Sequence, residues 1–168
     1  MNEKIKNLWQ RVKPYILPYS VAIAIPLTVG IISAALTRDS FSIYGELKAP
    51  PLAPPAILFP IIWTLLYILM GISSAIVFTN REKNPDVAKI GLKYYVISLL
   101  LNLSWSIVFF NLQAAFFALI ILITLLVLII KTVIEYHKVS TLAAYLQIPY
   151  VLWVIFAGYL NGAIWILN

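Results

Sequence analysis

The chain has 168 residues, of which 62% are hydrophobic and only 11% are charged. A water-soluble domain carries about 25% charged residues, so this composition excludes an ordinary soluble protein. The chain contains no cysteine, which excludes disulfides and thiolate metal sites. Its net charge of +6 requires no nucleic-acid partner, because membrane topology accounts for where the basic residues lie.

Four runs without charged residues divide the sequence: 14–37, 49–80, 94–130 and 139–168. Each run exceeds the roughly 20 residues that cross a hydrocarbon core, which predicts an integral membrane protein. The third run would extend about 55 Å as one helix against a core of about 30 Å, so it must fold back near Asn111 and Gln113. The sequence therefore predicts an all-α bundle of five transmembrane helices. We expect one domain over residues 1–168. Its helices are predicted at about 15–37, 56–79, 91–110, 114–136 and 141–167.

The twelve basic residues set the expected orientation of the five helices. All of them except Arg38 and Lys48 fall on one side of the bundle, before helix 1 or between helices 2 and 3 or 4 and 5. The positive-inside rule then places the N-terminus in the cytoplasm and the C-terminus outside a bacterial cell membrane. A cleaved signal peptide is the alternative for the first apolar run, but that run has the full length of a membrane span.

The loop after helix 1 is unusually rich in proline. Its candidate functional residues are Pro50, Pro51, Leu52, Pro54 and Pro55. Proline fixes φ and removes a hydrogen-bond donor, so such a loop can be ordered without regular structure. We expect it to be a stiff lid over the mouth of the bundle, although proline-rich segments also serve as simple spacers. Helices 1, 2 and 5 have Pro26, Pro60 and Pro149 within them or near their starts, which predicts kinks or caps.

Three helices carry stripes of aromatic and amide side chains. Trp63 and Tyr67 share a face of helix 2, because they lie four residues apart. The stripe on helix 3 consists of Asn102, Trp105, Ser106 and Phe109, and that on helix 5 of Tyr150, Trp153, Ala157 and Asn161. Such residues also form interfacial belts and bonds between helices, but three similar stripes favour a shared cavity for a flat apolar ligand.

Other patterns are less specific. The helix interiors contain no ionisable side chain, which argues against an obligatory proton antiporter. His137 is the only histidine and lies in the turn between helices 4 and 5, where a solvated side chain is the ordinary interpretation; no metal site is predicted. Gly158 and Gly162 form a G-x-x-x-G pattern, and Gly71 and Ala75 repeat the spacing; both permit close helix packing within the bundle or between protomers.

Three segments together resemble the TspO/MBR family, the tryptophan-rich sensory and translocator proteins. These segments are KAPPLAPPAILFPIIWTLLYILMG, LNLSWSIVFF and WVIFAGYLNGAIWILN. The resemblance implies a five-helix membrane protein, often a homodimer, whose pocket is closed by the long first loop. It implies porphyrins such as protoporphyrin IX and haem as ligands rather than required cofactors, and benzodiazepine-type and isoquinoline compounds as further ligands. Carried onto this sequence, the ligand-binding residues are Trp63, Tyr67, Asn102, Trp105, Phe109, Trp153, Ala157 and Leu160.

The sequence departs from the family pattern in two places. Leu52 and Ile57 stand where many members have tryptophan, which weakens stacking of the loop on a porphyrin. The sterol motif of animal members needs a basic residue after Tyr159, and none follows it here, while residues 133–138 fit that motif only loosely. Cholesterol binding is therefore not predicted.

The favoured hypothesis is a membrane sensor or regulator that binds tetrapyrroles. The alternatives are a light-dependent porphyrin-degrading enzyme, a porphyrin transporter and a scaffold that modulates a partner. No catalytic residue is assigned, and Trp63 and Trp153 are the candidates if the chain is an enzyme. The expected partners are porphyrins and other small apolar ligands, the lipid bilayer and a second copy of the chain.

Overall fold

The structure is a computed structural model that describes residues 3–40, 45, 47–48 and 50–168, without the side chains of residues 4–8 and 11. Within these residues, five helices are long and apolar enough to cross a membrane. They are α1 (Glu3–Thr37), α2 (Leu58–Thr79), α3 (Pro85–Ser106), α4 (Ala115–Val139) and α5 (Thr141–Leu167). The expected all-α architecture with five membrane helices is confirmed, and the chain is an integral membrane protein.

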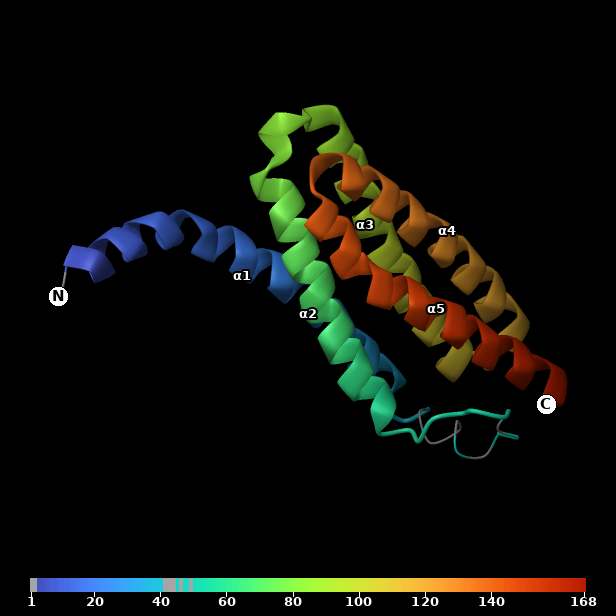
Figure 1. Cartoon of the computed structure of the whole chain (residues 1–168). Helices are drawn as coiled ribbons and strands as arrows, with labels where there is room; N and C mark the ends of the chain where they lie inside the picture. The colour runs from blue at the N-terminus through green and yellow to red at the C-terminus, as the bar shows by residue number, and fades with distance from the viewer. Residues whose placement is uncertain (1–2, 41–44, 46, 49) are drawn as a thin grey trace.

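The helices surround one apolar core (Figure 1). α1 packs mainly against α2, α2 also packs against α5, and α4 lies between α5 and α3. The contacts of α3 with α1 and α2 are few. The bundle is therefore tightly packed along α3, α4 and α5 and loosely packed where α1, α2 and α3 meet, so any space for a ligand is expected there.

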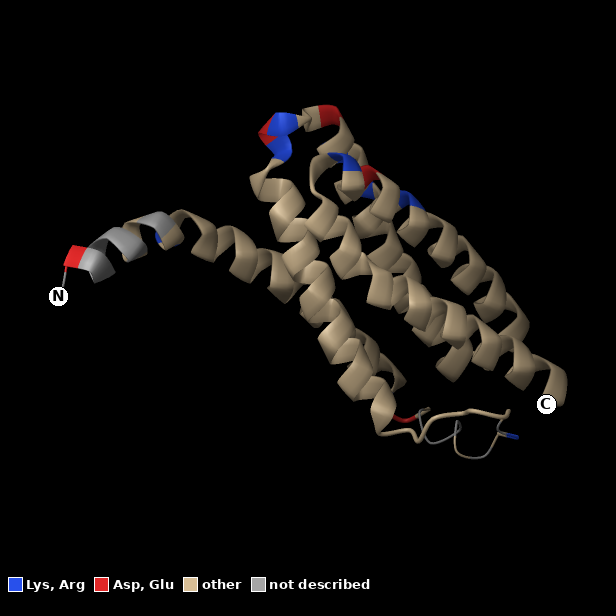
Figure 2. Ribbon diagram, viewed as in Figure 1, with Lys and Arg blue, Asp and Glu red and all other residues tan. Residues whose placement is uncertain are grey.

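Charged residues gather at one end of the bundle, as Figure 2 shows for the connection between α2 and α3 and the last turns of α4. That connection contains the short helix η2 (Arg81–Lys83). The Lys138 ammonium lies 2.8 Å from a carboxylate oxygen of Glu135. The spans between the ends are uncharged because an isolated charge in hydrocarbon is costly.

The first helix begins at Glu3 rather than near residue 15 as expected. Hydropathy marks only the part of a helix that crosses the hydrocarbon core, so it misses a helix that continues outside it. Figure 1 shows the first turns of α1 extending sideways, away from the other four helices. Pro14, Pro18 and Pro26 lie inside this helix and each removes one backbone hydrogen bond, which permits bending.

α3 starts at Pro85, earlier than the expected residue 91, because proline suits the first turn of a helix. It then continues as one turn of π-helix, η3 (Ile107–Asn111), in which the Leu112 amide donates to the Ile107 carbonyl oxygen at 3.1 Å. The wider turn places both Phe109 and Phe110 in the core, each only 8% exposed. Single π turns of this kind are frequent at functional sites.

Candidate functional site

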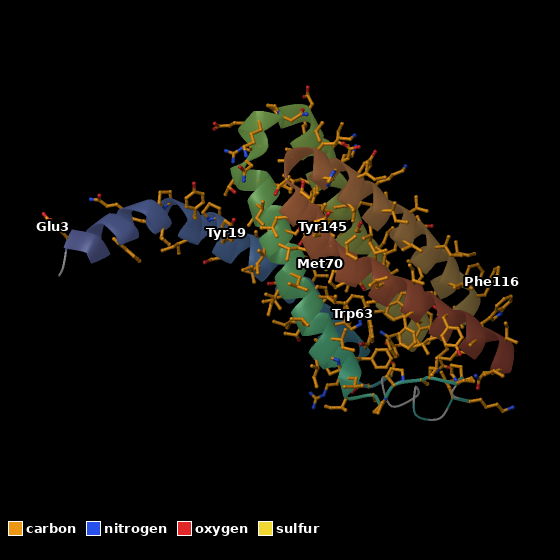
Figure 3. The ribbon with its side chains drawn as sticks, viewed as in Figure 1. Glu3, Tyr19, Trp63, Met70, Phe116 and Tyr145 are labelled. Carbon is orange, nitrogen blue, oxygen red and sulfur yellow. The ribbon has the colours of Figure 1, made fainter. Side chains whose placement is uncertain are left out.

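Trp63 lies at the centre of an aromatic cluster formed by α2, α3 and α5. Its ring centroid lies 5.5 Å from that of Tyr67, 6.5 Å from Trp105 and 6.1 Å from Tyr150. The ring of Trp153 stands perpendicular to it at 6.4 Å. Figure 3 labels Trp63 on the half of α2 nearer the first loop. The three sequence stripes therefore meet, but their rings pack against each other.

Amide side chains hold this cluster together. The Asn102 amide nitrogen lies 3.5 Å from the Tyr67 hydroxyl and 3.4 Å from the Tyr150 hydroxyl, both long hydrogen bonds. The Trp105 indole N–H donates to the Asn161 side-chain oxygen at 3.0 Å. Asn161 in turn donates to the Ala115 carbonyl oxygen at 2.7 Å, so one asparagine links α3, α4 and α5. Buried polar groups of a membrane bundle find partners in this way because the lipid supplies none.

The candidate residues on α5 lie beside this cluster. Ala157 and Leu160 are buried, and Trp153 is partly buried and packs against Phe59 at 5.9 Å between ring centroids. The Trp153 indole nitrogen is buried without a hydrogen-bond partner. An unpartnered buried donor costs roughly 1–3 kcal/mol, so a ligand acceptor or a water placed there would be stabilised.

A cavity of about 440 Å³ opens on the α1 side of the cluster. This volume falls in the range of about 300–1,000 Å³ that small-ligand pockets occupy. Of the candidate residues, Trp63, Tyr67 and Trp105 line it; Asn102, Phe109, Trp153, Ala157 and Leu160 do not. The remaining lining residues are Leu27, Gly30, Ile31, Ser33, Ala34, Thr37, Arg38, Phe59, Pro60, Thr64, Ser106 and Phe110.

Gly30 permits a close contact between α1 and α2 at the wall of the cavity. A Cβ atom at this position would lie only 2.4 Å from the Tyr67 Cε2 atom, closer than real Cβ contacts allow. The Tyr67 ring therefore lies against the bare α1 backbone, and only glycine fits opposite it. A single glycine among many apolar residues gives no such signal in the sequence.

The polar groups of the cavity are mostly occupied within their own helices. The Thr37 hydroxyl donates to the Ser33 carbonyl oxygen at 2.9 Å, and the Thr64 hydroxyl donates to the Pro60 carbonyl oxygen at 2.7 Å. Arg38 is the one cationic side chain among the described lining residues, and it is exposed. The cavity therefore offers a largely apolar wall of aromatic rings with a positive charge at its edge.

The proline-rich loop is fastened to the end of α5. The Tyr159 hydroxyl donates to the Pro51 carbonyl oxygen at 2.8 Å. The Lys48 amide donates to the Asn168 side-chain oxygen at 2.9 Å. Of the five candidate lid residues, Pro50 is buried and Pro54 partly buried, whereas Pro51, Leu52 and Pro55 are exposed. None of the five lines the cavity.

Leu52 occupies a strained position in this loop. The Ala53 amide donates to the Pro50 carbonyl oxygen at 3.1 Å, which closes a turn with Leu52 at φ 67°. Glycine is usual at such positive φ values, and a leucine there costs about 1–2 kcal/mol. Leu52 is 81% exposed and Ile57 68% exposed, so both positions that depart from the family pattern face outward.

The small-residue patterns contribute differently. A Cβ atom on Gly71 would lie 2.5 Å from the Ile23 Cα atom, so this glycine permits the close packing of α1 on α2. A Cβ atom on Gly158 would meet nothing within 4 Å, and one on Gly162 would only touch Leu119. The G-x-x-x-G pattern of α5 is therefore not needed for packing within the chain.

Sequence reasoning missed the contribution of α1 to the cavity. Leu27, Gly30, Ile31 and Thr37 carry no recognisable pattern, since an apolar helix in lipid shows little periodicity. Phe110 was missed because the π turn shifts it inward, and helical spacing from Trp105 does not anticipate that turn. Among the described residues there is no group of three or more His, Cys, Asp or Glu that could hold a metal ion.

Comparisons with known proteins agree with the resemblance seen in the sequence. A model of the TspO/MBR family matches residues 22–166. The chain is 37% identical to "Tryptophan-rich protein TspO" of Chlorobaculum tepidum over 91% of this chain and 97% of that protein. It is 36% identical to "Protein CrtK" of Rhodobacter capsulatus, over 74% and 78% of the two chains. It is also 33% identical to the bovine "Translocator protein", over 84% of each chain.

Proposed function

The chain belongs to the TspO/MBR family, and from this premise we propose that it is a membrane sensor or regulator that binds tetrapyrroles in the cavity between α1, α2 and α3. Relatives named as tryptophan-rich and translocator proteins support a sensory or regulatory role in the membrane. The observation that carries the proposal is the cavity itself, an apolar space with the indoles of Trp63 and Trp105 in its wall.

Two features of this cavity support a porphyrin as the ligand: its aromatic wall and the cation among its lining residues. Its flat ring system would stack on the aromatic wall, where pairs of rings contribute about 0.5–1.5 kcal/mol beyond the area that they bury. Protoporphyrin IX and haem carry carboxylates at one edge, and Arg38 at the edge of the cavity supplies a cation for them. Flat neutral compounds of the benzodiazepine and isoquinoline type would use the aromatic wall alone.

The proline-rich loop is the proposed lid over this site. Its attachment to α5 through Tyr159 and Asn168 holds it across the same end of the bundle. We expect these hydrogen bonds to slow the release of a ligand that lies beneath the loop. Two other candidate residues support the aromatic wall, since Asn102 bonds to Tyr67 and Phe109 stacks on Trp105. Ala157 and Leu160 are buried, and a ligand would reach them only if Trp63 rotated.

The test is a titration of the purified protein in detergent with protoporphyrin IX, followed by absorbance and tryptophan quenching. Trp63→Leu removes the central indole and is expected to weaken binding by about tenfold, since about 1.4 kcal/mol corresponds to tenfold. Trp9→Phe is the matched control, because Trp9 is 53% exposed on α1 and lies outside the cavity. Equal affinities for wild type and Trp63→Leu would refute the assignment of the site.

Light-dependent porphyrin degradation is the second candidate function. It is favoured by the perpendicular contact between Trp63 and Trp153, which places a second oxidisable indole against the one that lines the cavity. In that reaction dioxygen would oxidise the light-excited porphyrin and take up the electrons that the ring loses, and the two indoles would relay single electrons between them. Bleaching of bound porphyrin that requires light, oxygen and these tryptophans would establish chemistry, whereas a stable spectrum under light would leave binding alone.

We further infer that the protein is a homodimer in a bacterial cell membrane, with its N-terminus in the cytoplasm and its C-terminus outside. The orientation follows from the basic residues at one end of the bundle. The dimer follows from the family resemblance, and the open space beside Gly158 leaves one helix face available for close packing. Light scattering of the protein–detergent complex measures the number of chains directly.

A further inference from the structure

The N-terminal part of α1 lies outside both the bundle and the family match. The match begins at residue 22, whereas the helix begins at Glu3. Figure 3 labels Glu3 and Tyr19 on this extension, which projects sideways from the other helices. α1 has 35 residues, or roughly 52 Å as helix, against a hydrocarbon core of about 30 Å. About fifteen residues of this helix therefore cannot lie within the core.

Apolar residues recur along this extension at helical spacing. Ile5, Trp9, Val12 and Ile16 occur at i, i+4, i+7 and i+11, and Leu8, Tyr15 and Tyr19 fall beside them in the helical register. The described side chains of this stripe are exposed: Trp9 is 53%, Val12 44% and Ile16 41% accessible. Trp9, Val12 and Ile16 are therefore largely uncovered by the described part of the chain.

Basic residues flank the apolar stripe on both sides. Lys4 and Arg11 are seven residues apart and share one flank in the helical register; Lys6 and Lys13 are also seven apart and share the other. Gln10 and the other uncharged polar residues fall opposite the stripe. With four basic residues and one acidic residue, Glu3, the segment carries a net charge of +3. Such flanking positions let long side chains reach phosphate groups while their stems cover apolar surface.

We propose that residues 3–19 form an interfacial helix that binds the surface of a bilayer containing anionic phospholipids. The apolar stripe lies at the boundary of the acyl chains, and the two basic flanks contact the phosphates. The sideways direction of the extension in Figure 1 is the one that a helix lying in the membrane plane requires.

The charge of the extension and its connection to the first membrane span both indicate that it binds a lipid surface. The positive flanks complement anionic headgroups, and they would repel the same flanks of a second copy. The segment also continues into the apolar stretch Val12–Thr37, whose 26 residues extend about 39 Å and exceed a core of about 30 Å, so the first residues of that stretch can lie at the membrane surface. Pro14 and Pro18 occupy the junction and provide the bend between a helix in the plane and a helix across it.

The test uses the full-length protein in nanodiscs that hold one chain. The chain has no cysteine, so Val12→Cys and Gln10→Cys each give a single site for a nitroxide label. In discs with phosphatidylglycerol, the label at Val12, on the apolar stripe, is expected to be accessible to oxygen, and the label at Gln10 to a water-soluble nickel complex. In purely zwitterionic discs or at high salt, the Val12 label should become markedly more accessible to nickel.

Two fourfold variants distinguish binding by the extension from the attraction of the whole basic protein to anionic lipid. Replacing Lys4, Lys6, Arg11 and Lys13 by glutamine should reduce the ratio of bound to free extension in anionic discs by about a hundredfold or more, since each basic residue contributes about fivefold. Replacing Lys83, Lys89, Lys93 and Lys131, at the charged end of the bundle, should leave that ratio unchanged. Circular dichroism controls for the helical fold.

Three results would overturn the proposal. One is equal access of nickel to the Val12 and Gln10 labels in anionic discs. Another is immersion of the Val12 label that depends on neither lipid charge nor the four basic residues. The third is dipolar broadening between the Val12 labels in discs that hold two chains, together with loss of immersion of this label in discs that hold one. That result would show that the stripe binds a second copy of the chain.

Discussion

At the scale of single residues, the site depends on the size of the side chains at two positions, Trp63 and Gly30. Trp63 fills the space in which the three sequence stripes meet, and its ring forms a wall of the cavity on its α1 side. Gly30 lets the Tyr67 ring lie against α1 because it has no side chain. The wall of the cavity thus depends on one large side chain, that of Trp63, and on the close contact that Gly30 permits.

Gly30→Ala tests this balance. The added methyl group would lie 2.4 Å from the Tyr67 ring, so the ring or α1 must move. We expect a loss of about 1–3 kcal/mol in stability and weaker porphyrin binding, because overpacking strains a close helix contact. Thermal unfolding in detergent and the absorbance titration measure the two effects. Gly158→Ala is the control, since its methyl group meets nothing within 4 Å; equal behaviour of the two variants would contradict the assignment.

Asn161→Leu tests the hydrogen bonds behind the aromatic wall. Asn161 accepts from the Trp105 indole and donates to Ala115, so its loss leaves a buried N–H and a buried carbonyl without partners. Bonds between membrane helices contribute about 0.6–1.7 kcal/mol, and we expect a destabilisation of about 1–2 kcal/mol. Chemical or thermal unfolding checks the value. A variant as stable as wild type would show that these bonds contribute little to the bundle.

At the scale of elements, the π turn and the first loop shape the end of the bundle near the cavity. η3 brings Phe109 and Phe110 inward together, and the rings of Trp105 and Phe109 stack at 5.5 Å between centroids. The described proline-rich residues of the loop do not line the cavity, and hydrogen bonds connect the loop to Tyr159 and Asn168 at the end of α5. Its effect on a ligand would therefore be on entry and escape rather than on direct contact.

Tyr159→Phe removes the hydroxyl that holds Pro51. If the loop is a lid, we expect ligand dissociation to become several-fold faster, with a smaller change in association, because affinity changes are usually found in the dissociation rate. Stopped-flow tryptophan quenching gives both rates. Tyr145→Phe serves as the control because Tyr145 is 66% exposed on the same helix. Unchanged dissociation in Tyr159→Phe would show that the loop is a spacer.

At the scale of the whole molecule, the distribution of charge determines how the bundle sits in the membrane. Figure 2 shows basic residues at the α2–α3 connection and the end of α4. Arg38 and Lys48 lie between α1 and α2, in the loop at the opposite end. The N-terminal extension of α1 adds four more basic residues. The positive-inside rule and the proposed surface helix therefore call for the same orientation.

Single cysteines test this orientation because the wild-type chain has none. Asn84→Cys lies in the connection between α2 and α3, and Gly45→Cys lies in the first loop; both positions are exposed. A membrane-impermeant maleimide should label the first only from the cytoplasmic side and the second only from outside. Labelling of both cysteines from one face of sealed vesicles would contradict the topology.

The sequence by itself determined the number of membrane helices, the family and the residues of the central aromatic cluster. Each of these depends on local composition or spacing: charge-free runs must cross the bilayer, and side chains four residues apart share a helix face. The tertiary structure alone decided where the space lies. Trp63 fills the space where the stripes meet, the cavity lies beside it against α1, and the π turn adds Phe110 to its lining. Packing between helices depends on which side chains of neighbouring helices contact each other. Neither the hydropathy nor the residue spacing of a single helix determines those contacts.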